Sequence, residues 1–118
     1  MIVFEPGDVA LVALPYTDLL SVKKRPAIVI SPSDFSKRHG DTIVLALTSR
    51  PSEDEALRLE DWREAGLLKP TWIKPVISTL ASHAFERRLG TVTERDGKRV
   101  TAALDSMITL ERFRHSDW

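Results

Sequence analysis

The sequence predicts a mainly β protein: a small antiparallel barrel with a C-terminal helix, in a single domain that spans residues 1–118. Three apolar runs, at 9–14, 26–30 and 42–47, are short and rich in β-branched residues, which is typical of buried strands. The spacers between these runs hold at most a short helix, which is too little for a series of parallel crossovers. Helical spacing of apolar residues appears near the C-terminus, at Val100, Leu104, Met107 and Ile108.

The first strand follows a turn signal, Pro6-Gly7-Asp8, and is stopped by Pro15. It is apolar at every position, as expected of a strand that is covered on both faces. The polar stretch 16–24 reads as a loop. The second strand then begins at Pro26, whose ring pushes Arg25 toward an extended backbone.

A short helix is expected after the second strand, with Ser31 as its cap and Pro32 in its first turn. His39-Gly40-Asp41 ends this helix and leads into the third strand.

The middle of the chain is less regular. Residues 56–60 alternate between leucine and charged residues, which favours a half-exposed strand. Asp61 to Ala65 suits a single helical turn that Gly66 ends, and 70–79 reads as extended. Pro75 requires that this last strand lies at a sheet edge or contains a bulge. The stretch 80–90 is ambiguous.

Two readings exist for the C-terminal part. Thr93 followed by Asp96 favours a helix start, whereas Asp96-Gly97 also suits a hairpin turn. The helix is favoured because the apolar spacing continues well past Thr101.

Charge and composition exclude several classes of function. Lys and Arg balance Asp and Glu at 17 each, so any nucleic-acid site must be a local basic patch. The cations cluster at 23–25, 87–88 and 98–99. The chain has no cysteine, which excludes disulfides and thiolate metal sites. It shows neither a signal peptide nor an apolar run near the ~20 residues that span a bilayer, so we expect a cytoplasmic protein.

Several common catalytic devices are missing from the sequence. The three histidines, His39, His83 and His115, lack the spacing of metal ligands. There is also no glycine-rich phosphate loop and no Gly-x-Ser-x-Gly motif. No metal or cofactor is therefore expected.

What remains is a possible anion site at two strand ends. Arg25 and Lys24 precede one apolar run, and Thr48 and Ser49 follow another. A guanidinium offers phosphate a fork of donors, and hydroxyls donate to phosphate oxygens, so this set suits phosphodiester cleavage without a metal. The alternative is structural: Arg25 forms an ion pair at the strand end and Thr48 ends its strand.

Blocks of residues along most of the chain resemble the MazF/PemK toxin family. They are Pro6 to Val9, Leu14 to Asp18, Lys23 to Ser31, Ile43 to Ser49, Gly66 to Lys74 and Leu89-Gly90. The resemblance implies an SH3-like (CcdB-like) barrel, usually a homodimer, that acts as a metal-independent, sequence-selective endoribonuclease. It also implies neutralisation by a small antitoxin protein.

The resemblance assigns roles by position. The arginine before the family's proline falls on Arg25 and its strand-end threonine on Thr48, so both are implied to be catalytic. Some members carry an Arg-x-Asp pair after the middle loop, where this chain reads Trp72-Ile73-Lys74. Candidate RNA-binding residues are Lys24, Ser49, Tyr16, Asp18 and Lys74.

Two other functions compete with the nuclease. One is a CcdB-like gyrase poison that acts through C-terminal residues such as Arg112 and Phe113. The other is a catalytically silent barrel that binds RNA or a protein partner. We also expect a homodimer, since the runs 28–30 and 45–47 exceed what one small barrel easily covers.

Overall fold

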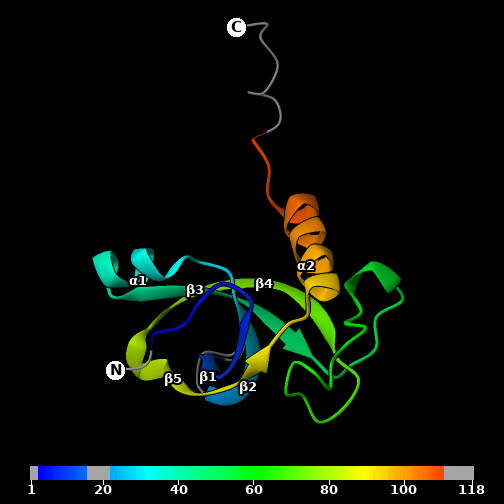
Figure 1. Ribbon diagram of the computed structural model, residues 1–118, viewed down its shortest axis with the longest axis horizontal. Helices are drawn as coiled ribbons and strands as arrows, with labels where there is room; N and C mark the ends of the chain where they lie inside the picture. Colours follow the sequence, from blue (N-terminus) through cyan, green and yellow to red (C-terminus); the bar gives the residue numbers. More distant parts are fainter. Residues whose placement is uncertain (1–2, 16–21, 111–118) are drawn as a thin grey trace, which may run out of the picture.

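The computed structural model describes residues 3–15 and 22–110. Five strands and two helices follow one another along the chain, with two short 3-10 turns between them (Figure 1). The strands are β1 (Asp8–Pro15), β2 (Val22–Val29), β3 (Asp41–Thr48), β4 (Trp72–Ala81) and β5 (Phe85–Thr91). The helices are α1 (Ser33–His39) and α2 (Glu94–Met107), and the 3-10 turns are η1 (Glu55–Leu57) and η2 (Ser82–Ala84).

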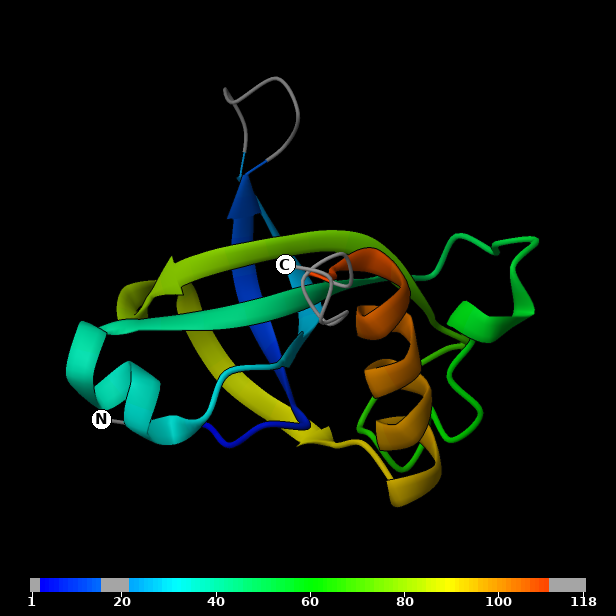
Figure 2. The ribbon, with the colours of Figure 1, turned by 90° about the horizontal axis from the view of Figure 1, so that it is seen from above.

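All strand pairs are antiparallel, and the sheet order is β4-β3-β2-β1-β5. The sheet curls, so that β3 and β4 cross over β1 and β5 (Figures 1 and 2). The η2 turn joins β4 to β5, yet these two strands lie at opposite ends of the hydrogen-bonded order. The mainly β fold with a C-terminal helix is thus confirmed, as a barrel-like sheet that is not fully closed.

Each face of the sheet has its own core, which explains why the runs 9–14 and 43–47 are apolar at every position. Val9 and Ile28 belong to the core beneath α2, which also holds Val100 and Ala103 of that helix. Ala10 and Val29 belong to the core on the opposite face, together with Phe4. Alternate residues of one strand thus serve different cores.

These cores remove one argument for a dimer. Ile28, Val29 and Leu45 to Leu47 are buried within the single chain. The apolar runs therefore need no second copy to cover them, so this argument for a homodimer was wrong, while the expectation of a homodimer does not depend on it.

Two boundaries in the first half differ from the prediction. Strand β2 begins at Val22 instead of Pro26, because 22–25 continue the pairing with β1 as far as Pro15. Helix α1 begins at Ser33, with Pro32 at the N-cap position. Ser31 does not cap it; its buried hydroxyl accepts a hydrogen bond from the Ile43 amide at 2.9 Å.

The strand predicted at 56–60 is wrong. The Asp54 carboxylate accepts the Ala56 amide hydrogen and starts η1 instead, so that only Arg58 bridges to Trp72. The prediction for Pro75 holds: β4 is an edge strand, and its register with β3 shifts between Leu45 and Leu47.

The C-terminal segment is a helix, as favoured, and the hairpin alternative is wrong. The Thr93 hydroxyl accepts the Asp96 amide hydrogen at the N-cap. The helix ends at Met107, so that Ile108 lies beyond it and is exposed. Within 3–15 and 22–110, no helix is long and apolar enough to cross a membrane.

Candidate active site

A cavity of about 300 Å³ opens at one end of the sheet, between four strands and the segment 66–71. Its polar lining consists of Arg25, Thr48, Ser49, Lys69, Thr71 and Arg87. Its apolar lining consists of Leu11, Pro26, Leu47, Leu67, Leu68 and Leu89. The cavity therefore combines cations and hydroxyls with apolar walls.

Strand pairing brings Arg25 and Thr48 together. Strands β2 and β3 pair antiparallel, with Ala27 opposite Ala46. Continued by two residues, this register sets Arg25 opposite Thr48. Arg25 is exposed and Thr48 half-buried, and both line the cavity. The two strand ends thus meet at one open site.

The Thr48 hydroxyl is already oriented by the backbone. Its oxygen accepts a hydrogen bond from the Arg50 amide at 3.1 Å. This leaves the hydroxyl hydrogen to donate to a bound oxygen. Ser49, the next residue, is exposed at the cavity edge.

The far wall of the cavity is fixed by a close contact between two glycines. Gly66 has a φ of 82°, and a Cβ there would overlap the carbonyl oxygen of Leu89. A Cβ on Gly90 would lie 2.5 Å from the carbonyl oxygen of Ala65. Only glycine permits this backbone approach, which seats the segment after Gly66 against β5.

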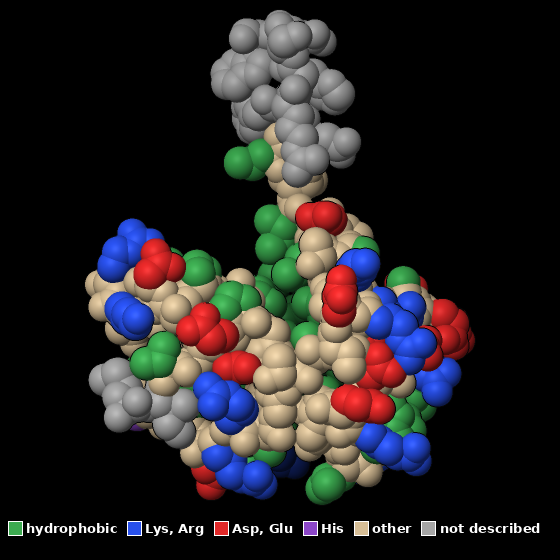
Figure 3. Space-filling model, viewed as in Figure 1, with side chains coloured by type: hydrophobic (Ala, Val, Ile, Leu, Met, Phe, Trp, Pro, Cys, Tyr) green, Lys and Arg blue, Asp and Glu red, His purple; other side chains and the backbone are tan. Residues whose placement is uncertain are grey.

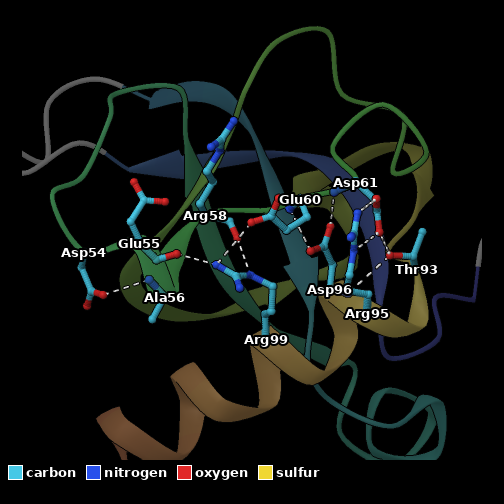
Figure 4. A network of polar contacts seen from close by, with 10 residues as sticks. All are labelled: Asp54, Glu55, Ala56, Arg58, Glu60, Asp61, Thr93, Arg95, Asp96 and Arg99. Atoms are coloured by element: carbon cyan, nitrogen blue, oxygen red, sulfur yellow. Dashed lines mark hydrogen bonds and ion pairs between the residues drawn. The ribbon is translucent and has the colours of Figure 1, made fainter.

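Helix α2 holds the first part of the connection between β3 and β4, the loop 49–71, through polar contacts (Figure 4). The fully buried Asp96 carboxylate accepts the amide hydrogens of Glu60 and Asp61, at 2.9 and 2.7 Å. Arg99 donates from Nε to the carbonyl oxygen of Arg58 at 2.7 Å and from Nη2 to that of Glu55. The loop thus docks on α2 through its backbone.

Asp61 adds a side-chain link to the start of the helix. Its carboxylate accepts hydrogen bonds from the Arg95 guanidinium and from the Thr93 hydroxyl, the latter at 2.6 Å. The Arg95 hydrogen bond is the main reason why the pKa of Asp61 lies below its ordinary value, with Thr93 adding to it. The same contact raises the pKa of Arg95.

Two of the predicted RNA-binding residues, Lys24 and Lys74, do not line the cavity. Lys24 forms an ion pair with Glu86 of β5 at 2.8 Å, and Lys74 is exposed on β4; neither lines the cavity. Tyr16 and Asp18 lie outside the described residues, as do Arg112 and Phe113. No three His, Asp or Glu side chains within 3–15 and 22–110 lie close enough to hold a metal ion.

Sequence reasoning missed several residues of the cavity, among them two cations. Arg87, Lys69 and Leu68 all line it, and Leu68 is 96% exposed. The Arg87-Arg88 pair was visible as a charge cluster. Nothing local, however, indicated that β5 returns to lie beside β1.

A second, larger groove of about 580 Å³ runs beside α2 and is mainly apolar. Its walls include Ile30, Val92, Val100 and Leu104, and Figure 3 shows apolar side chains gathered in a hollow beside this helix. It contains none of the predicted site residues.

Comparison with solved structures places the fold among known toxins. MazF from Deinococcus radiodurans superposes with a TM-score of 0.71 at 17% identity, covering 91% of this chain and 97% of that one. An endoribonuclease from a mycobacterial species gives 0.70 at 18% identity, covering 91% and 92%. An endoribonuclease in complex with its cognate antitoxin, also from a mycobacterial species, superposes with a TM-score of 0.63 at 18% identity, covering 91% of this chain and 94% of that one.

A search of curated protein sequences found no significant match. A family model does match, over residues 5–108, and it describes the PemK-like, MazF-like toxin of type II toxin–antitoxin systems. Because this match spans most of the chain and agrees with the fold, the protein belongs to the PemK/MazF toxin family.

Proposed function

We propose that this toxin is an endoribonuclease that cleaves single-stranded RNA at the cavity. The observation that carries the proposal is that Arg25 and Thr48, from two different strands, line the same open cavity. A guanidinium and a hydroxyl at one accessible site match the needs of a phosphodiester whose charge increases during reaction. The fold likeness to solved endoribonucleases supports the same assignment.

The proposed reaction is an attack by the ribose 2′-hydroxyl. The 2′ oxygen bonds to phosphorus and loses its proton, while the bond from phosphorus to the 5′ oxygen breaks and that oxygen gains a proton. The products are a 2′,3′-cyclic phosphate and a free 5′-hydroxyl. Arg25 stabilises the additional negative charge on the phosphate, and Thr48 donates its free hydroxyl hydrogen to a phosphate oxygen.

RNA would extend from this point over the neighbouring surface. Ser49 lies at the cavity edge, and Lys24 and Lys74 carry exposed positive charge outside it. With Tyr16 and Asp18, these residues remain candidates for holding the strand and selecting its sequence. Single-stranded RNA is commonly read through base stacking and base edges, which suits a selective cut.

The proposal includes partners and a compartment. Solved relatives include MazE–MazF complexes and an endoribonuclease bound to its cognate antitoxin, so we propose that an antitoxin protein neutralises this chain too. We further propose a homodimer that acts in the cytoplasm, where its RNA substrate is found, with no cofactor.

The test is cleavage of RNA in the presence of a chelator. The wild-type protein should give fragments with 2′,3′-cyclic phosphate and 5′-hydroxyl ends. Arg25→Ala should abolish them, and Thr48→Val should reduce them far more than Thr48→Ser, which keeps the hydroxyl. Lys37→Gln, on the exposed surface of α1, is the matched control. Undiminished cleavage by Arg25→Ala would reject the assignment.

A further inference from the structure

The side chains that line the cavity carry a net positive charge. Arg25, Lys69 and Arg87 line it, and no Asp or Glu within the described part of the chain does. The whole chain has a formal net charge of zero, so this concentration of cations is local. Arg25 alone would serve one phosphate, which leaves two further cations without an assigned role.

Strand register places Arg87 across the cavity from β2. Arg87 pairs with Leu11 of β1, and Leu11 pairs with Pro26 on the other side. Two strand spacings of about 4.8 Å therefore separate the backbones of Arg87 and Pro26 by about 10 Å. Arg25, next to Pro26 on β2, and Arg87 of β5 both line the cavity.

The neighbours of Arg87 have structural partners, whereas Arg87 has none among the described residues. Glu86 pairs with Lys24 at 2.8 Å, and Arg88 pairs with Asp8 at 3.0 Å. Arg87 is exposed and forms no ion pair with any residue in 3–15 or 22–110. Its charge is therefore available to a ligand in the cavity.

Lys69 is held on the same wall by its backbone. The Thr71 hydroxyl donates a hydrogen bond to the Lys69 carbonyl oxygen at 2.8 Å, and Gly66 seats this segment against β5. Its side chain is exposed and has no ion-pair partner in the described part of the chain. A fixed backbone with a free ammonium group lowers the cost of ordering the side chain on a phosphate.

We propose that Arg87 and Lys69 form a second phosphate-binding subsite, which holds a phosphate next to the one that is cleaved. The inference rests on the proposed function for the identity of the ligand, an RNA strand. Contacts of this kind fix the register of the strand and are independent of base sequence. They would draw the backbone across the cavity and set the cleaved phosphate against Arg25.

The subsite is tested by binding, without cleavage. The probe is a short, fully 2′-fluorinated RNA of randomised sequence, which lacks the attacking hydroxyl, followed by fluorescence anisotropy between about 50 and 200 mM salt. Each lost phosphate contact should reduce the slope of log affinity against log salt by about 0.7. We expect this reduction for Arg87→Gln and for Lys69→Gln, and about 1.4 for the double variant.

Two controls separate charge from structure. Arg87→Lys keeps the charge and should retain the wild-type slope, and Lys37→Gln removes a cation on α1 and should also leave it unchanged. Thermal unfolding confirms that each variant is folded.

The outcomes distinguish this inference from the nuclease proposal. An unchanged slope in both Arg87→Gln and Lys69→Gln overturns the subsite even if the wild-type protein cleaves RNA, and so does a failure of the wild type to bind the probe. Conversely, the expected loss of slope supports the subsite even if no cleavage products form.

Discussion

Substitution of Asp96 by alanine should loosen the loop that forms one wall of the cavity. The Asp96 carboxylate is fully buried and accepts two backbone amide hydrogens from the loop, those of Glu60 and Asp61. Hydrogen bonds to charged groups contribute about 1.5–3 kcal/mol each, and both donors would lose their acceptor. Allowing for partial relaxation of the loop, we expect unfolding free energy to fall by about 3–5 kcal/mol.

Urea unfolding measures this loss directly, with Asp105→Ala as the matched control. Asp105 lies on the same helix but is exposed, so its removal should change stability by no more than about 0.5 kcal/mol. Under conditions where Asp96→Ala remains folded, its RNA cleavage should still be reduced, because the loop that carries Lys69 is no longer held. If Asp96→Ala matches Asp105→Ala in its urea midpoint, the proposed anchoring of the loop by α2 is wrong.

Three further predictions concern the same wall. Gly66→Ala should lower the unfolding free energy by about 2–5 kcal/mol, because the backbone there is left-handed and a Cβ would overlap with β5. Gly40 has a similar φ of 76° but open space around it, so Gly40→Ala should lower it by only about 1–2 kcal/mol in the same urea assay. Because Arg95 lowers the pKa of Asp61, this pair stabilises the fold at pH values above the ordinary pKa of 3.8, and the contribution is lost as pH falls below that value. Urea unfolding of Asp61→Asn between about pH 6 and pH 3 should therefore show a smaller loss of unfolding free energy toward acid pH than wild type shows. Identical curves for the two proteins would contradict the assignment. Leu68→Ser should leave stability within about 0.5 kcal/mol, since the side chain is 96% exposed, yet weaken RNA binding in the anisotropy assay; unchanged binding would remove Leu68 from the RNA surface.

The strands were predictable because their side chains serve two cores. Runs such as 9–14 and 43–47 are apolar at every position, and the structure places residues of both runs in the cores on the two faces of the sheet. The errors in predicted elements arose where a side chain forms a hydrogen bond that competes with the predicted structure. Residues 56–60 alternate like a strand, but the Asp54 carboxylate caps a 3-10 turn there, and the Ser31 hydroxyl is used by the Ile43 amide instead of by α1.

The candidate site was predictable only where its residues adjoin an apolar run. Arg25 and Thr48 flank runs that sequence identifies as strands, so the cavity they share followed from antiparallel pairing. Arg87 and Lys69 reach the cavity through contacts between distant parts of the chain: the pairing of β5 with β1, and the close approach of Gly66 to Leu89. Neither contact has a local signal in the sequence.

The structure also explains how a chain with no net charge can present a cationic cavity. Several acidic residues are used to hold the scaffold together: Asp8 binds Arg88 and the Thr91 hydroxyl, Asp96 binds loop amides, and Asp61 binds Arg95. These contacts place negative charge away from the cavity, and no Asp or Glu among the described residues lines it. The cavity thereby keeps its positive charge for a polyanion. We therefore expect a salt dependence that reflects a few phosphate contacts, in contrast to the steep dependence of a uniformly basic protein.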